Sequence, residues 1–145
     1  MPWFAAVLAG LVASPAVPDD VASDGKVAVT VSGIRNDHGL VRVALCTKTD
    51  FPGKHCAYQA SAPAQQGVVT VSLAGVPSGP YAAQGWHDES GEGHMTRSTL
   101  GLPREGFGFS NDPALLLGPP GFEDAAFTVG SRGARVSMRL RYLRQ

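Results

Sequence analysis

The sequence predicts an all-β fold, a single antiparallel β-sandwich of about seven strands. Three observations favour this class. Several short segments alternate apolar and polar side chains with a period of two, as half-buried strands do. The 18 glycines and 11 prolines suit a chain that turns often. No segment carries an apolar repeat of helical period over more than about two turns, which argues against long amphipathic helices.

The first two strands are predicted over 26–34 and 40–46. Each places valine or leucine at alternate positions, with Val27, Val29 and Val31 in the first and Val41, Val43 and Leu45 in the second. Between them, Asn36-Asp37-His38-Gly39 carries turn chemistry, and Gly39 is free to take positive φ. We expect the two strands to form an antiparallel hairpin.

The later strands follow the same alternation and are predicted over 67–76, 81–87, 125–129 and 135–142. A long connection from Asp88 to Gly121, rich in glycine and proline, separates the middle strands from the last two. In the final strand the apolar side chains face inward, and an outward stripe is formed by Arg135, Arg139 and Arg141. Such stripes commonly guard a sheet edge against aggregation.

Length and charge restrict the function classes. The chain of 145 residues suits one domain, and its 43% hydrophobic content can form a core. Basic and acidic side chains number 12 each, so the formal net charge is zero. This balance lacks the overall basic excess that binding to nucleic acid or anionic lipid would require, and we predict no nucleic-acid partner.

Residues 1–18 are predicted to be a signal peptide. They contain no charged side chain, and the apolar run from Trp3 to Val12 is too short to cross a bilayer. Small residues place a cleavage site after Ala16; the alternative is a buried apolar N-terminal segment. We therefore expect a linker over 19–25, one domain over 26–145 and no transmembrane segment in the mature chain. The protein is predicted to be exported to the periplasm or medium, where its partner belongs to the envelope or the extracellular space.

Cys46 and Cys56 are the two cysteines of the chain. In an oxidising compartment such a pair normally closes into a disulfide. The alternatives are two free buried thiols or a redox pair, and the absence of a Cys-x-x-Cys arrangement disfavours the redox role. We predict a structural disulfide.

The segment His87-Asp88-Glu89-Ser90-Gly91-Glu92-Gly93-His94 is the richest in chemistry. Asp88, Ser90 and Glu92 occupy alternate positions before a glycine, as in the first half of a calcium loop. Thr99 stands where that pattern has a bidentate glutamate. The predicted metal ligands are Asp88, Ser90, Glu92 and His94, with Ca²⁺ as the candidate ion. The alternative is a solvated acidic turn without an ion.

The two imidazoles of this segment, His87 and His94, also permit zinc or copper, which would need further ligands to converge on them. Catalytic pairs can be written, Ser110 with His87 or Asp88 with Glu105, but no sequence motif fixes either pair in space. Aromatic and polar groups that could contact a ligand are His87, Glu105, Phe107 and Phe109.

Three stretches carry a resemblance to a known family. They are Gly79-Pro80-Tyr81-Ala82 leading to His87-Asp88-Glu89, the segment from Gly101 to Ser110, and the segment from Pro120 to Phe127, with a last strand ending at Tyr142. Over about 27–142 the chain resembles the bacterial exported family called domain of unknown function 2141 (DUF2141). The resemblance implies an exported sandwich, transthyretin-like or carboxypeptidase-regulatory-like, and it implies no activity.

Relatives in that family usually read HDENGNGKLD where this chain has residues 87–96. Here Ser90 and Glu92 replace two asparagines, and Thr96 replaces the last aspartate. These changes weaken an ion site at the loop. We therefore expect a non-catalytic binding or accessory module of the cell envelope. The alternatives are a metal-dependent enzyme that uses His87, Asp88 and His94, or a purely structural module.

Overall fold

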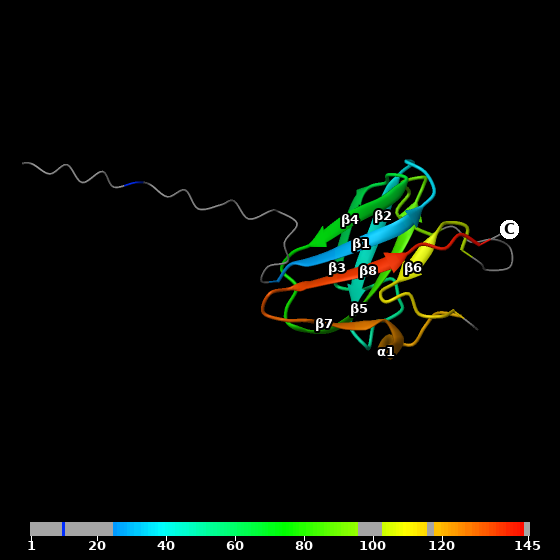
Figure 1. Ribbon diagram of the computed structural model, residues 1–145. Coiled ribbons are helices and arrows are strands. Elements are labelled where there is room, and N and C mark those ends of the chain that lie inside the picture. The colour runs from blue at the N-terminus through cyan, green and yellow to red at the C-terminus, as the bar shows by residue number, and fades with distance from the viewer. Residues whose placement is uncertain (1–9, 11–24, 96–102, 116–117, 144–145) are drawn as a thin grey trace, which may run out of the picture.

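The computed structural model describes residues 10, 25–95, 103–115 and 118–143 (Figure 1). The predicted leader and linker lie outside this part of the chain, apart from Gly10 and Gly25. The elements in order are β1 (Val27–Ile34), β2 (Leu40–Cys46), β3 (Tyr58–Pro63), β4 (Gly67–Leu73), β5 (Gly79–Asp88), β6 (Phe107–Phe109), α1 (Phe122–Ala125), β7 (Ala126–Val129) and β8 (Ala134–Arg139).

The strands form two sheets. One has the order β4-β1-β8, and the other has the order β3-β2-β5-β6 with β7 also paired to β5. Figure 1 shows β4, β1 and β8 side by side in one layer, with β2 and β5 behind them. All pairs are antiparallel except β1 with β8, which run parallel. The predicted all-β, mostly antiparallel fold is confirmed.

The predicted hairpin between the first two strands is wrong. β1 pairs with β4 and β8, whereas β2 pairs with β3 and β5 in the opposite sheet. The valines that suggested a hairpin are buried on the facing inner surfaces of the two sheets. Gly39 makes the crossing possible, because its φ is +69° and a Cβ there would collide with the Asp88 carbonyl oxygen.

The core lies between the two sheets. β1, β4 and β8 supply Val29, Val71 and Met138, while β2 and β5 supply Val43 and Ala83, all of them buried. Small and β-branched side chains on alternate positions therefore hold the layers together. β3, β6 and α1 are elements that the sequence did not predict.

A second apolar cluster covers the outer face of the five-stranded sheet. The predicted disulfide between Cys46 and Cys56 is present, with a Cα–Cα distance of 4.7 Å. Its loop carries Phe51, which packs against Phe109 at a ring distance of 5.7 Å. The Gln84 side chain accepts a hydrogen bond from the Gly53 N–H and donates one to the Gly53 carbonyl. The loop is thus held to β2 by the disulfide, to β6 by Phe51 and to β5 by Gln84.

Candidate functional site

His87 points inward from β5 and is completely buried. One ring nitrogen, Nε2, lies 2.6 Å from the His38 carbonyl oxygen, and Nδ1 lies 2.9 Å from the Tyr142 hydroxyl. Because a carbonyl can only accept, Nε2 carries a proton. Both nitrogens of the ring are therefore engaged, which fixes its orientation.

Tyr142 anchors His87 from the end of the chain. Its hydroxyl also accepts the Arg35 backbone N–H at 3.1 Å, and the Arg35 guanidinium lies 4.5 Å from the centre of its ring. Burial raises the pKa of the Tyr142 hydroxyl despite the opposing effect of Arg35. A Cβ on Gly106 would collide with the Tyr142 ring, so the segment before β6 packs directly on the aromatic face.

Asp88 points the other way from His87 and is also completely buried. Its Oδ2 accepts from Arg42 Nε at 2.7 Å and from the Gly93 N–H at 2.9 Å, and its Oδ1 accepts from the Gly91 N–H at 3.0 Å and Ser90 Oγ at 3.4 Å. Burial opposes ionisation, but the Arg42 hydrogen bond and charge and the two N–H groups hold the pKa of the Asp88 carboxyl below its usual value. Asp88 thus closes the loop that follows β5.

The predicted metal ligands have separate roles. Ser90 donates to Asp88, while the carboxylate of Glu92 and the ring of His94 lie 3.4 Å apart at the surface, with side chains 56% and 72% exposed. Within residues 25–95, 103–115 and 118–143, no three His, Cys, Asp or Glu side chains gather where they could hold a metal ion. A cation at Asp88 would also compete with Arg42. Calcium, zinc and copper binding stay predictions, and the contacts of Asp88 count against them.

The candidate catalytic pairs contact other groups. Ser110 is buried, and its Oγ lies 2.5 Å from the Ala125 carbonyl, to which it donates, and 2.9 Å from the Ala83 N–H, from which it accepts. Those bonds tie β6 and α1 to β5. The hydrogen bonds of His87 and Asp88 described above go to neither Ser110 nor Glu105. The Glu105 side chain instead lines a pocket.

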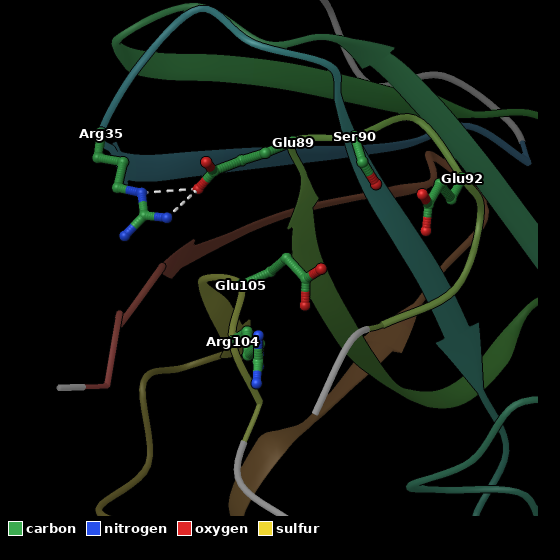
Figure 2. A pocket seen from close by; sticks show the side chains of 6 residues that line it. All are labelled: Arg35, Glu89, Ser90, Glu92, Arg104 and Glu105. Atoms are coloured by element: carbon green, nitrogen blue, oxygen red, sulfur yellow. Dashed lines mark hydrogen bonds and ion pairs between the residues drawn. The ribbon is translucent and has the colours of Figure 1, made fainter. Parts of the chain in front are cut away.

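Figure 2 shows that pocket, an open space of about 250 Å³ lined by Arg35, Glu89, Ser90, Glu92, Arg104 and Glu105. Arg35, just after β1, forms an ion pair with Glu89. Its Nε lies 2.6 Å and its Nη2 2.5 Å from Glu89 Oε1. Arg104 and Glu105 come from the segment before β6, and Glu105 is 8% exposed. Arg104 is exposed and forms no ion pair within the described residues.

The predicted ligand surface is divided between two faces. Phe107 and Phe109 stand on the outer face of the five-stranded sheet, in register with Trp86 and Gln84, whereas His87 points into the sandwich. Phe109 packs under the disulfide loop. Sequence reasoning missed Arg35 and Arg104 as pocket residues, because no local pattern marks them and they come from distant parts of the chain.

The chain matches a known protein family over most of its length. The family described as "Uncharacterized protein conserved in bacteria (DUF2141)" matches residues 29–137. The chain belongs to this family. The DUF2141 region runs from β1 into β8 and includes all six pocket residues, while Tyr142 lies just beyond it. Searches of curated proteins and of solved structures gave no match.

The described part of this DUF2141 chain contains no helix of the length and apolarity needed to cross a membrane.

Proposed function

We propose that this DUF2141 protein is an exported, non-catalytic binding module of the cell envelope, and that it binds a small ligand with charges of both signs. The observation that carries the proposal is the pocket at the end of β5. It combines carboxylates and guanidinium groups on a frame fixed by buried hydrogen bonds.

Two features support export. The N-terminal 18 residues have the composition of a signal peptide, with an apolar run too short for a membrane span. The disulfide between Cys46 and Cys56 suits an oxidising compartment, because cytosolic thiols are normally kept reduced.

The engaged polar side chains support a non-catalytic role. A nucleophile needs an adjacent base that can take its proton, and a general base needs a free lone pair facing a substrate. His87, Asp88 and Ser110 are completely buried, and their polar atoms bond to other parts of the fold. These side chains serve to position the loops around the pocket.

The charges at the pocket suggest the ligand's chemistry. Arg104 offers a planar donor group that suits a carboxylate or phosphate. Glu92, whose side chain is 56% exposed, offers an acceptor for an amine. Arg35 and Glu89 already form an ion pair, which holds these two side chains in place at one wall of the pocket. The volume of about 250 Å³ is below that of most drug-sized sites, so a small zwitterion fits better than a large ligand.

The test is a titration of the full chain with amino acids, dipeptides and acidic amino sugars, followed by amide chemical shifts in NMR. We expect saturable shifts around the pocket for at least one compound. Arg104→Ala should weaken that binding by about tenfold or more, since it removes a charge-assisted contact.

Lys54→Ala is the matched control, because it removes an exposed cation from the disulfide loop. It should leave the affinity unchanged. No saturable shifts at about 10 mM for any compound, or equal weakening by the two variants, would contradict the proposal.

A further inference from the structure

The arginine stripe predicted from the sequence stands on the outer face of the three-stranded sheet. Arg135 and Arg139 of β8 and Arg141 just after it are exposed, while Met138 and Leu140 between them are buried. Arg132, in the turn before β8, is exposed as well. Within the described chain, none of these four arginines forms an ion pair.

The neighbours of these arginines across the sheet are uncharged. The register places Ala28 and Ser72 beside Arg135, Thr30 and Thr70 beside Ser137, and Ser32 beside Arg139. The strands β4, β1 and β8 that carry them lie in one layer in Figure 1. This face therefore carries positive charge along one side and small hydroxyl or methyl groups over the rest.

Protection of the sheet edge does not explain the stripe. The edge of β8 is already closed by hydrogen bonds from the Asn111 N–H to the Ser137 carbonyl and from the Arg139 N–H to Asp112 Oδ1. Beyond β8, Arg141 and Phe107 exchange backbone hydrogen bonds at 2.8 and 3.0 Å. An edge whose backbone groups are already hydrogen-bonded does not need charged side chains to prevent aggregation. The Asp112 carboxylate contacts the backbone of this strand.

An exposed apolar side chain, Val68, lies on the same face. Val68 of β4 is 56% exposed and Leu143 is 37% exposed, and these are the exposed large hydrophobics among the described residues. Val68 stands at the Arg139 end of the sheet, because Val69 pairs with Val31, next to Ser32. Leu143 follows Arg141 along the chain. Arginines with apolar neighbours on a flat surface are typical of contact with a membrane interface.

We propose that the outer face of β4, β1 and β8 docks on the surface of a bilayer that contains anionic phospholipid. Arg135 and Arg139 are four residues apart, about 13 Å along the strand, so their guanidinium groups reach separate phosphate groups. Val68 enters the headgroup boundary beside them. The contacts are spread over a flat face, which suits a planar anionic partner better than a single small anion. This inference is independent of the proposed ligand pocket.

The test is co-sedimentation of the full chain with phosphatidylcholine vesicles, with and without about 30% phosphatidylglycerol, at about 0.1 M salt. We expect binding that requires phosphatidylglycerol and weakens as salt rises. R135Q/R139Q should lower the partition coefficient about 25-fold, at about fivefold for each arginine. V68T should lower it by a smaller factor without changing the salt dependence.

K48Q/K54Q is the matched control. It removes two positive charges from the disulfide loop on the opposite face of the sandwich, one of which, Lys48, pairs with the exposed Glu123 at 3.2 Å. It should change the partition coefficient by less than about twofold. All variants carry the same residues 1–24, so any membrane affinity of that segment cancels when the variants are compared. The thermal midpoint of each variant checks that the fold is retained. Equal losses in the two double variants, absence of binding to anionic vesicles, or binding to heparin in place of vesicles would overturn the proposal.

Discussion

Replacing Asp88 by alanine should strongly destabilise the protein, because its carboxylate joins β2, β5 and the following loop. The substitution removes the partner of Arg42 and the acceptor of the Gly93 N–H, whereas the Gly91 N–H keeps the Asp88 backbone carbonyl at 3.3 Å as an acceptor. The lost Gly93 bond costs about 1 kcal/mol. The Arg42 side chain is 31% exposed, so water partly replaces its partner, and loss of the pair costs about 1–2 kcal/mol. The sum is about 2–3 kcal/mol, or about 8–12 °C in the unfolding midpoint.

The pH dependence gives a second measurement on the same residue. The pKa of the Asp88 carboxyl is lowered in the folded state, so folding favours its ionised form. Its stabilising effect is fully present above the unfolded pKa of about 3.9 and is lost as pH falls through the folded pKa. The stability difference between the wild type and Asp88→Asn should therefore be constant from about pH 7 to pH 5 and should shrink below about pH 4.

Glu92→Ala is the control, because Glu92 lies in the same loop and its side chain is 56% exposed. It should change the free energy of unfolding by less than about 0.5 kcal/mol. Urea unfolding followed by circular dichroism measures both variants. If Asp88→Ala costs no more than Glu92→Ala, or if the difference from Asp88→Asn does not shrink as pH falls below about 4, the role assigned to Asp88 is refuted.

Other changes test the rest of the fold. Serine at Cys46 and Cys56 should lower stability by about 2–3 kcal/mol, and an unchanged urea midpoint would contradict a stabilising disulfide. Gly39→Ala should cost more than about 3 kcal/mol, since the new Cβ would collide with the Asp88 carbonyl, whereas Gly91→Ala, also at positive φ but in open space, should cost about 1 kcal/mol; equal costs would disprove the importance of that contact. Calcium or zinc in place of EDTA should leave the thermal midpoint unchanged, because the Asp88 oxygens are already bonded, and a rise abolished by Asp88→Asn would establish an ion site.

The sequence predicts strands well where one face is buried and the other is solvated. β2 has the predicted bounds, and β1 begins one residue later than expected. β3 escaped prediction because its inward side chains include Ala60 and Ala62, which are small and weakly apolar and leave little contrast in hydropathy between its faces. β6 has three residues and takes its place from pairing with β5. Strand pairing itself was wrong for β1 and β2, because alternation shows that a face is buried and does not show against which sheet.

The site was harder to predict, because its contacts join residues that are far apart in the sequence. The loop from Asp88 to Gly93 has the spacing of half a calcium loop, but Arg42, 46 residues earlier, occupies the carboxylate. Arg35 and Glu89 meet across a separation of 54 residues. The same spacing of side chains can either close a loop or bind an ion. Which of the two occurs depends on groups that are remote in the sequence, such as Arg42 here.

The parallel pairing of β1 with β8 has a consequence for the order of folding. The first strand finds one of its two neighbours in the last strand, and the Arg35 N–H reaches the Tyr142 hydroxyl across 107 residues. Contacts this remote slow folding, because a long loop must close before they form. A chain that is synthesised or translocated from its N-terminus cannot complete the three-stranded sheet until Ala134–Arg139 is available. The three-stranded sheet is therefore completed late, after β8 has emerged, which would suit the export proposed above.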